Sequence, residues 1–527
     1  MHHMLRRSAA TSPDKQAIVC GSRRLSYAQL WQDVSSFASA LKASGFQRGQ
    51  RLAILLEPSI EQSTSIFAAS AAQGAYVPIH HSLKPDQVTH ICSDCTVTGL
   101  ITTKKRWGDL QDHLDHLPSL TFVVLTDILT EDHAGPIPVH SYQTFLSGDV
   151  STTPVTDITI GKDLAAILYT SGSTGKPKGV MLSHDNVIAG AEIVGDYLRV
   201  THEDRILAVL PFSFDAGMNQ LTTAVLKGAT LVISQFRFAR DVIAELIREK
   251  ITGLAGVPPF WNLFVQPSSG LTKANLPHLR YITNTGGAMP QSTLGLLRHG
   301  LPGTQVFLMY GLTEAFRSTY LPPSELDRRP TSMGKAIPNT EILVVKEDGS
   351  PCGPGEVGEL VHHGPTVSLG YWGQEELTAR ILRPHPFSLP GSNNAVKVCY
   401  SGDLVKMDED GFLYFVGRRD NLIKSSGFRI SPTEVEQAIC RNKSVREAAV
   451  VGVADELLGQ HIKAYVVPVD GEQLTETDII AQASEAMPRY MVPKSVDIVD
   501  QLPKTSSGKI DYPTLKRRAE ESALQPS

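Results

Sequence analysis

The 527-residue sequence is poor in cysteine, in net charge and in long apolar runs. Six cysteines are too few for a disulfide-bonded scaffold in a chain of this length. No apolar run approaches the roughly 20 residues that a membrane-spanning helix needs. A formal net charge of -5 gives no electrostatic reason to bind nucleic acid or an anionic membrane. What remains is an ordinary globular composition, with 41% hydrophobic and 20% charged residues.

Residues that could bind a metal are also sparse. Cys92 and Cys95 form a lone CxxC, which we interpret as two buried thiols because no second pair lies near them. The 17 histidines show no ligand spacing and predict no zinc site. Residues 1–16 carry positive charge without an apolar stretch behind them, which does not fit a secretory signal. We therefore expect a cytoplasmic protein.

The length predicts two or more domains. Strand-like and helix-like stretches alternate over the first several hundred residues, which favours layered α/β structure. Residues 341–370 change to short strands with Gly and Pro turns, which indicates a small β-rich subdomain. The expected strands cover residues 17–20, 51–56, 99–102, 164–169, 205–210, 229–234, 281–285 and 305–309, and the expected helices cover 27–44, 60–73, 217–227 and 240–250.

Beyond residue 417 the pattern indicates a small α+β domain of about a hundred residues. A helix is expected over residues 432–440, with Ser431 as its N-cap and Pro432 at its first position. Strands at 448–453 and 462–467 follow, and then a helix at 475–486.

A glycine- and hydroxyl-rich loop follows the apolar run at 164–169 and reads LYTSGSTGKPKGVMLSH over 168–184. Glycines let the backbone turn tightly and approach a ligand, while hydroxyls and lysines add donors and charge. The composition suits the polyphosphate of a nucleotide, although a flexible surface loop is composed similarly. It is not the common P-loop, because two residues separate its first glycines and proline follows the first lysine. The loop contains Ser171, Gly172, Ser173, Thr174, Gly175, Lys176, Lys178 and Gly179.

This string resembles the phosphate-binding motif of the AMP-forming adenylating superfamily, which includes acyl- and aryl-CoA synthetases, luciferase and peptide synthetase adenylation domains. Further matches follow in the superfamily's order along essentially the whole chain. They are Thr285-Gly286-Gly287-Ala288, Tyr310-Gly311-Leu312-Thr313-Glu314, Tyr400-Ser401-Gly402-Asp403, Gly417-Arg418-Arg419-Asp420 with Ile423-Lys424 and Gly427-Phe428-Arg429-Ile430, and Pro503-Lys504-Thr505-Ser506-Ser507-Gly508-Lys509-Ile510. The resemblance implies a large N-terminal domain over 1–417, a hinge at 418–420 and a mobile C-terminal domain over 421–527.

The resemblance also implies a reaction in two halves. A carboxylate attacks the α-phosphate of ATP, giving an acyl-adenylate and pyrophosphate, and a thiol of coenzyme A or of a carrier protein's phosphopantetheine then takes the acyl group. Mg²⁺ is implied at Glu314, with Thr174 or Thr313, and carboxylate and hydroxyl oxygens are the ligands that Mg²⁺ prefers. The pyrophosphate is assigned to Ser171, Ser173, Thr174 and Lys178, with Gly172 and Gly175 in the same loop.

Further positions are assigned to the nucleoside and to the substrate. Adenine is expected against Tyr310, in the motif that contains Gly311, and against the backbone of Gly287 and Ala288. Asp403 and Arg418 match the pair that fixes the ribose. The positions that match the substrate pocket are Asp215, Gly286 and Arg317. His184 ends the phosphate motif, and for it a capping or packing role is as good an interpretation as substrate handling.

Four residues of the C-terminal region are expected to act through domain rotation. Lys509 matches the lysine that binds the substrate carboxylate and the α-phosphate, whereas Lys504 precedes the motif's glycine and fits less well. Asp420 matches the hinge, whose backbone torsions change between the half-reactions. Lys424 and Gly427 match positions used in thioester formation.

The substrate is the open part of the prediction. Asp215 lies where peptide synthetase domains place the carboxylate that binds an α-ammonium group, and an unpaired acid in an apolar acyl pocket is costly. Asp215 and Arg317 either pair with each other beside an ordinary acyl pocket or receive a polar substrate. PFSFDAGMNQLTTA from Pro211, ITGLAGVPP from Ile251 and LMYGLTEAFRSTYLPP from Leu308 most resemble acyl-CoA ligase-like proteins associated with exosortase clusters.

We therefore expect an ATP-dependent, AMP-forming ligase of the acyl-CoA synthetase type that acts on a small carboxylic acid. The first alternative is an enzyme that adenylates an amino acid and loads it onto a carrier protein. The remote alternative is a non-catalytic binding protein of the same fold. No nucleic acid and no membrane span are expected.

Overall fold

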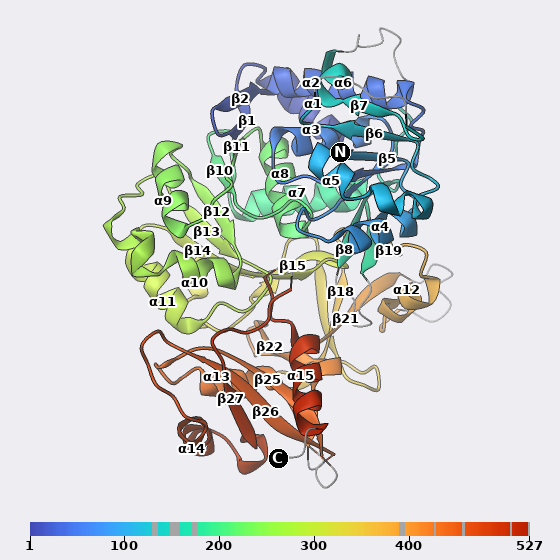
Figure 1. Cartoon of the computed structure of the whole chain (residues 1–527). Helices are drawn as coiled ribbons and strands as arrows, with labels where there is room; N and C mark the ends of the chain where they lie inside the picture. Colours follow the sequence, from blue (N-terminus) through green and yellow to red (C-terminus); the bar gives the residue numbers. More distant parts are fainter. Residues whose placement is uncertain are drawn as a thin grey trace. The chain divides into compact units, whose positions relative to one another are not determined.

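The computed structural model describes residues 1–128, 135–147, 157–170, 177–388, 396–425, 428–455, 459–505 and 508–524. Contacts among these residues divide the chain into two units. Figure 1 shows the whole chain, with colours that follow the sequence. Unit 1 comprises residues 1–341 and 362–399, and unit 2 comprises residues 342–361 and 400–527. The chain passes between them at the start of β17 (Glu341–Val345) and along β18 (Val357–His363) and β21 (Lys397–Met407).

Unit 1 contains a nine-stranded sheet in the order β16-β15-β14-β13-β12-β10-β11-β1-β2. Its middle strands pair in parallel, and several are buried along their whole length, as expected for strands covered on both faces. The strands are β1 (Gln16–Cys20), β2 (Arg23–Ser26), β10 (Arg205–Ala208), β11 (Thr230–Ile233), β12 (Gly253–Gly256), β13 (Tyr281–Asn284), β14 (Gln305–Leu312), β15 (Ala315–Leu321) and β16 (Lys335–Ala336).

An eight-stranded sheet of unit 1 has the order β19-β9-β8-β4-β3-β5-β6-β7. The glycine-rich loop joins two of its neighbours, β8 and β9, which pair antiparallel. The strands are β3 (Arg51–Ile54), β4 (Ala75–Pro78), β5 (Gly99–Thr102), β6 (Phe122–Leu125), β7 (Val139–Ser141), β8 (Leu164–Thr170), β9 (Lys178–Ser183) and β19 (Gly370–Tyr371).

Helices α7 and α8 pack against each other, α7 against β8 and β9 and α8 against β10 and β11, so they lie between the two sheets. A capping box starts α7, because Ser183 Oγ accepts from the Asn186 N–H at 3.1 Å and Asn186 Oδ1 accepts from the Ser183 N–H at 2.8 Å. The helices of unit 1 are α1 (His2–Thr11), α2 (Tyr27–Ala43), α3 (Ile60–Ala71), α4 (Pro85–Asp94), α5 (Lys104–Gly108), α6 (Tyr142–Ser147), α7 (His184–Tyr197), α8 (Asp215–Lys227), α9 (Ala239–Arg248), α10 (Pro258–Phe264), α11 (Gln291–Gly300) and α12 (Glu375–Ile381).

Three of the elements of unit 1 that differ from the sequence-based expectation have a clear physical reason or consequence. Helix α8 begins at Asp215, two residues before the expected start, because Phe214 has extended backbone angles and serves as the N-cap. Strand β14 continues through Leu312, because it pairs with β15 in a hairpin whose last pair is Leu312 with Ala315. Helix α1 was not expected, and it buries Met4 and Leu5.

Unit 2 contains most of a sheet in the order β17-β18-β21-β20, with β22 beside β21, and a second sheet in the order β24-β23-β26-β25, with β27 beside β26. Ser431 Oγ accepts from the Glu434 N–H at 3.2 Å and Pro432 is the first residue of α13, which confirms the predicted cap. The remaining elements are β17 (Glu341–Val345), β20 (Leu382–Pro384, in unit 1), β22 (Leu413–Arg418), β23 (Ile423–Ser425), β24 (Phe428–Ile430), β25 (Val445–Asp455), β26 (Gly459–Pro468), β27 (Ser495–Ile498), α13 (Pro432–Ile439), α14 (Glu476–Ala486) and α15 (Tyr512–Leu524).

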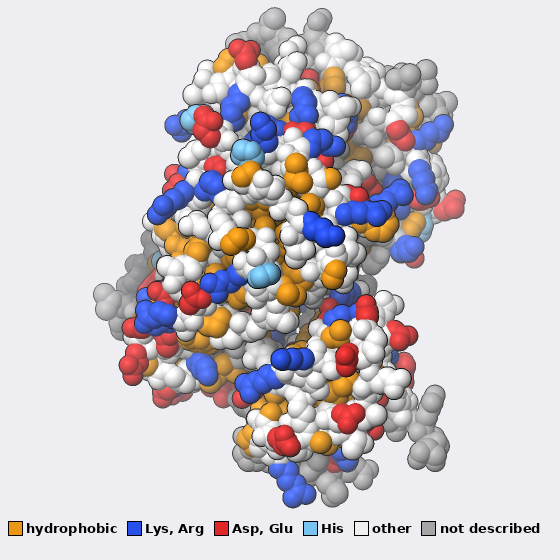
Figure 2. All heavy atoms as spheres, turned by 90° about the vertical axis from the view of Figure 1, so that its left-hand side faces the viewer, with side chains coloured by type: hydrophobic (Ala, Val, Ile, Leu, Met, Phe, Trp, Pro, Cys, Tyr) orange, Lys and Arg blue, Asp and Glu red, His pale blue; other side chains and the backbone are white. Residues whose placement is uncertain are grey.

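The surface carries charges of both signs. On the face drawn in Figure 2, Lys and Arg side chains are interspersed with Asp and Glu and with scattered apolar groups. Within the described part of the chain, no helix combines the length and apolar character that crossing a membrane requires.

Candidate functional site

The glycine-rich loop lies largely outside the described residues. Its flanking strands are paired, and the last pair of the β8–β9 hairpin is Thr170 with Lys178. Lys178 is half-buried, and its Nζ lies 5.9 Å from the centroid of the Tyr371 ring. The candidates outside the described part are Ser171, Gly172, Ser173, Thr174 and Gly175.

Glu314 lies at the tip of the β14–β15 hairpin in unit 1. Because Leu312 pairs with Ala315, the tip consists of Thr313 and Glu314. The Tyr371 hydroxyl donates to Glu314 Oε1 at 2.6 Å. Glu314 is half-buried, and no described residue forms a hydrogen bond or ion pair with its other carboxylate oxygen. A carboxylate held by one oxygen and open at the other fits a Mg²⁺ ligand.

Tyr371 was missed by the sequence reasoning. The Tyr371 side chain contacts both Glu314 and Lys178. The candidate metal ligand and a candidate phosphate ligand therefore lie beside the same tyrosine. Tyr371 and Glu314 are 57 positions apart in the sequence, and no motif spacing links them.

The candidate adenine residues lie at the ends of β13 and β14. Tyr310 stacks on His362, with ring centroids 6.1 Å apart and an interplanar angle of 17°. His362 is 1% exposed, and its ring nitrogens have no hydrogen-bond partner among the described residues. Burial lowers the pKa of His362 to about 3, so this imidazole, which the sequence did not single out, is neutral at pH 7.

At two positions of these motifs the backbone requires glycine. A Cβ on Gly311 would lie 2.8 Å from the Arg317 backbone nitrogen, so only glycine permits the close approach of β14 and β15. Gly286 has φ +77°, which favours glycine, and the loop that contains it is held by Asn284 Nδ2, which donates to the Gly287 carbonyl at 2.9 Å. Ala288 follows in the same loop.

Asp215 and Arg317 form no ion pair with each other. Asp215 is half-buried in the first turn of α8, where a carboxylate interacts favourably with the helix dipole. Arg317 is 4% exposed, has φ +57°, and donates from Nη1 to Thr285 Oγ1 at 2.9 Å. Among the described residues neither side chain makes a salt bridge, so the pairing alternative has no support in this conformation.

In unit 2, Asp403 and Arg418 face each other across β21 and β22. Asp403 is 3% exposed, and Arg418 Nε donates to its Oδ1 at 2.7 Å. Glu359 supports the turn before Asp403, because its carboxylate accepts from the Gly402 N–H at 3.0 Å and pairs with Arg419. The sequence predicted the first pair but not Glu359.

The candidate hinge and thioester residues are only partly described. Asp420 lies in a 3₁₀ turn, Arg419–Asn421, and Lys424 lies in β23, opposite Arg429 of β24. Gly427 falls outside the described residues.

Lys509 lies in a turn that immediately precedes α15. The Thr505 N–H donates to the Lys509 carbonyl at 2.8 Å, and the Gly508 N–H donates to the Thr505 carbonyl at 2.9 Å. Lys509 is exposed, and no described carboxylate pairs with it. Lys504 is instead tied to Glu447, at 3.1 Å.

A half-buried residue with a desolvated carboxyl, Glu436, lies next to this segment in unit 2. Its Oε1 accepts from the Tyr512 hydroxyl at 2.7 Å and from the Val450 N–H at 2.9 Å. Burial raises the pKa of Glu436 to about 7, against the lowering effect of these two hydrogen bonds. Glu436 therefore titrates near neutral pH in the domain that carries Lys509.

The structure also describes His184, which ends the phosphate motif, and the two thiols of the CxxC pair. His184 is the first residue of α7, and burial lowers its pKa to about 3. Cys92 and Cys95 are buried free thiols, and burial raises the pKa of Cys95 to about 12. Both thiols are therefore protonated and unreactive at neutral pH.

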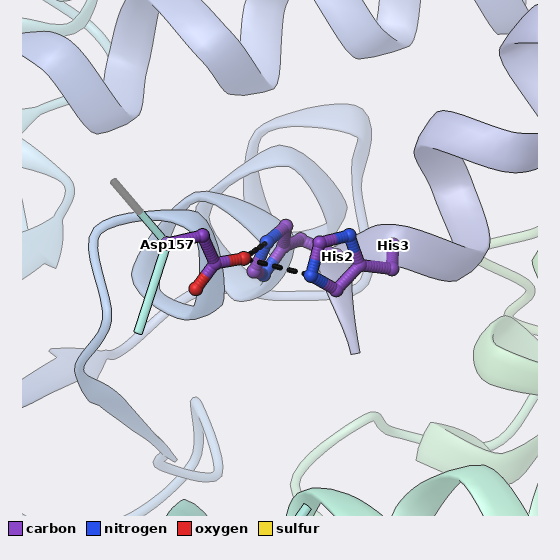
Figure 3. Close-up of side chains that lie close together, drawn as sticks. All are labelled: His2, His3 and Asp157. Carbon is purple, nitrogen blue, oxygen red and sulfur yellow. Dashed lines mark hydrogen bonds and ion pairs between the residues drawn. The ribbon is translucent and has the colours of Figure 1, made fainter. Parts of the chain in front are cut away.

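His2, His3 and Asp157 bring three potential ligand atoms within 4.8 Å of one another, a cluster that sequence spacing could not reveal (Figure 3). His2 Nε2 and His3 Nε2 lie 2.9 Å and 2.7 Å from the same oxygen, Asp157 Oδ2. Hydrogen bonds from the two imidazoles to one carboxylate account for this arrangement without an ion. The cluster ties the start of α1 to residue 157.

Two family descriptions match the chain. "AMP-binding enzyme" matches residues 5–372, and "AMP-binding enzyme C-terminal domain" matches residues 434–509.

Curated relatives include enzymes of different lengths. An indoleacetate–CoA ligase of Aromatoleum aromaticum is 30% identical over 96% of this chain and 95% of its own length. An L-proline–[L-prolyl-carrier protein] ligase of Streptomyces coelicolor is 32% identical over 93% of this chain and 92% of its own. A component of the linear gramicidin synthase of Brevibacillus parabrevis is 31% identical over 97% of this chain, which spans only 9% of that protein.

Solved structures agree with the sequence matches. ATP-bound MatB from Rhodopseudomonas palustris superposes with a TM-score of 0.86 at 26% identity, covering 99% of both chains. The o-succinylbenzoate CoA synthetase of Bacillus subtilis in complex with ATP and a magnesium ion gives a TM-score of 0.82 at 25% identity, covering 98% of both.

Proposed function

Because the chain belongs to the AMP-binding enzyme family, we propose that it activates a small carboxylic acid as an acyl-adenylate and transfers the acyl group to the thiol of coenzyme A. Family membership confirms the predicted superfamily, the fold class and the reaction class, the AMP-forming ligation of an acid to a thiol. ATP and Mg²⁺ are the cofactors. The narrower resemblance to exosortase-associated proteins stays a prediction.

One observation carries the proposal. The two family matches cover residues 5–372 and 434–509, so the second match ends at Lys509. A reaction that separates pyrophosphate from AMP needs cations at the developing anion, and Lys509 is an exposed lysine of the second domain. Its position in a turn before α15 fits a side chain that reaches outward from its own domain.

In the first half-reaction, the hairpin tip of unit 1 and the glycine-rich loop receive ATP. Glu314 offers one open carboxylate oxygen to Mg²⁺, with Thr174 or Thr313 as its companion, while Tyr371 holds the other oxygen. Bound Mg²⁺ neutralises charge on the phosphates. Lys178 and the hydroxyls of the loop contact the leaving pyrophosphate, and Tyr310 lies against adenine.

In unit 2, Asp403 and Arg418 bind the ribose. Asp403 is a buried carboxylate oriented by Arg418, and a carboxylate that accepts from both ribose hydroxyls fixes a nucleoside. The domain boundary at 417, the hinge at Asp420 and the roles of Lys424 and Gly427 in the thioester step belong to this proposal. Rotation about such a hinge exchanges Lys509 for the thioester residues.

The second candidate function is the loading of an amino acid onto a carrier protein. Asp215 favours it, because this carboxylate is half-buried and pairs with no described cation, so it could bind an ammonium group. The similarity to a prolyl-carrier protein ligase makes a carrier protein a reasonable acceptor to test. With either acceptor, the requirement for ATP favours the cytoplasm.

The test is substrate-dependent exchange between ATP and labelled pyrophosphate over a panel of carboxylic and amino acids, with Mg²⁺ present and absent. We expect exchange with at least one acid class, and thioester formation when coenzyme A is then added. Thioester formation only with a phosphopantetheinylated carrier protein would favour the second function. Tight ATP binding without exchange for any acid would leave the non-catalytic alternative.

A further inference from the structure

A cavity of about 30 Å³ lies in unit 1 between helices α7 and α8 and the strands β10 and β12–β15. A buried water needs roughly 10–15 Å³, so the space corresponds to about two waters. Most of its wall is apolar, including Val194, Ile206 and Met309. Arg317 is the charged residue of the wall, and no acidic residue lines it.

Three residues of the cavity wall carry a buried polar atom without a partner. Among the described residues, Arg317 Nε, Asn219 Nδ2 and Gln220 Oε1 are buried and have no hydrogen-bond partner. Their residues are only 4%, 2% and 6% exposed. Buried polar groups are almost always hydrogen-bonded, and a buried cation without an anion is strongly unfavourable. Three such atoms at one cavity therefore indicate a group that binds there.

We infer that this cavity binds a small anionic group at the far end of the carboxylic acid substrate, an inference that rests on the proposed function. Arg317 Nε and Asn219 Nδ2 are donors and require an acceptor, and the charge of Arg317 requires that the acceptor be an anion. Gln220 donates its amide to the Leu207 carbonyl at 2.9 Å, so its free Oε1 accepts from a hydroxyl or from a water beside the anion. The volume suits a carboxylate but not an aromatic ring.

The same guanidinium connects this cavity to the nucleotide motifs. Arg317 Nη1 donates to Thr285 Oγ1, and Thr285 begins the loop assigned to adenine. Arg317 also lies on β15, the strand that follows the Glu314 tip. A left-handed backbone at Arg317, φ +57°, is costly for a non-glycine residue, and such strain persists where the surroundings fix a residue for function. The far end of the acid and the metal ligand thus share one hairpin.

Asp215 is a separate feature. It lies in the first turn of α8 and does not line this cavity. The substrate class inferred here is therefore an acid with a second, distal anionic group, such as a dicarboxylate, whether or not an amino group is also present.

The experiment compares mono- and dicarboxylic acids of equal chain length, from four to six carbons, in pyrophosphate exchange. We expect a dicarboxylate to exceed its monocarboxylate by about 100-fold or more in kcat/KM, because a site built for a polar group rejects the analogue that lacks it. Arg317→Met should remove that preference, and Asn219→Leu should reduce it by about 10-fold. Lys227→Met is the matched control, because Lys227 lies on α8, pairs with Asp196 and is not in the cavity wall.

Thermal unfolding gives a readout independent of turnover. The preferred dicarboxylate alone should raise the Tm of the wild-type protein and of Lys227→Met but not that of Arg317→Met. Without ligand, Arg317→Met should unfold at a temperature equal to or above that of the wild type, because it removes an unpaired buried charge. Exchange with monocarboxylates only, unchanged in Arg317→Met, would overturn the inference and leave the proposed function intact. Exchange with no acid at all would overturn the proposed function.

Discussion

In unit 1, burial lowers the pKa values of His2 and His80 to about 4 and those of His184 and His362 to about 3. In unit 2, the group with the opposite response is a carboxyl, Glu436, whose pKa burial raises to about 7. At pH 7 these four histidines of unit 1 are neutral and resist protonation, whereas Glu436 of unit 2 resists ionisation and titrates near this pH. Unit 2 also contains a base with a lowered pKa, His461.

The candidate sites of the two units also differ in how their buried polar groups are partnered. Around the cavity of unit 1, Arg317, Asn219 and Gln220 keep unpartnered atoms, whereas Asp403 and Glu359 of unit 2 have partners within the unit. This difference fits a division in which unit 1 supplies a binding site that a ligand completes. Unit 2 supplies prearranged groups and an exposed lysine.

The largest effect is expected at the exposed lysine of unit 2. Lys509→Ala should slow adenylation by about two to four orders of magnitude, the scale of losing a prearranged charge at a developing anion. Lys504→Ala is the control, because its side chain is tied to Glu447 and it should change the rate less than about threefold. Single-turnover formation of the acyl-adenylate measures both. Equal losses in the two variants would remove Lys509 from the chemistry.

The next effect concerns the desolvated carboxyl of unit 2. Between pH 4.5 and 7 the folded protein holds a proton on Glu436 that the unfolded chain has released, so stability is lost as pH rises through this window. The whole loss corresponds to about 3 kcal/mol. Glu436→Gln keeps an acceptor for Tyr512 and Val450 and removes the titration. Urea midpoints from pH 5 to 8, read from unit 2 by hydrogen exchange, should flatten in this variant, and an unchanged slope would contradict the assignment.

A third comparison separates the half-reactions. With Lys424 in its proposed role in the thioester orientation, Lys424→Ala should leave adenylation intact and slow thioester formation from preformed adenylate by about one to two orders of magnitude. Asp420→Pro should act similarly, since proline fixes φ at the hinge and holds one orientation. Quench-flow measurement of each half-reaction decides the question. If Lys424→Ala and Lys509→Ala impaired both steps equally, domain rotation would be the wrong explanation.

Local structure was predictable where neighbouring residues determine it. Ser431 and Pro432 marked the start of α13, because a cap and its first turn depend on adjacent residues alone. The start of α8 at Asp215 was missed, because apolar periodicity does not register the extended backbone of Phe214. The contact between Tyr371 and Glu314 joins two distant strands and has no local signal.

The site was predictable in the same uneven way. Motif order assigned Glu314, Asp403 and Lys509 by resemblance, and their roles stay predictions. The cavity could not be found from the sequence, because its wall comes from two helices and five strands that meet only in the folded protein. The phosphate loop, which carried the strongest sequence signal, lies largely outside the described residues.

The stability of unit 1 at low pH is tested at His362, one of its histidines with a lowered pKa. Its folded pKa of about 3 lies below the unfolded value, so the unfolded chain takes up a proton first and stability is lost as pH falls below about 6.5. At pH 5 the loss is about 2 kcal/mol. His362→Phe keeps a ring against Tyr310 and should reduce the fall in urea midpoint between pH 7 and 5, whereas His363→Gln, at the neighbouring half-buried histidine, should not. An identical fall in all three proteins would show that His362 is not a buried neutral base.

The smallest effect on stability is expected at Asp215, a residue that also bears on the class of substrate. As a carboxylate in the first turn of α8, it should contribute about 0.5 kcal/mol through the helix dipole, so Asp215→Asn should lower the urea midpoint slightly. Since Asp215 is absent from the cavity wall, this variant should keep the ratio between dicarboxylates and monocarboxylates that Arg317→Met destroys.

Pyrophosphate exchange with amino acids is the sensitive measurement of the role of Asp215. A selective loss of that exchange by about 100-fold would show that Asp215 binds an ammonium group, because the variant would break a desolvated charge pair. That result would favour the loading of a carrier protein. Unchanged exchange with every acid would leave Asp215 as a helix-starting residue only.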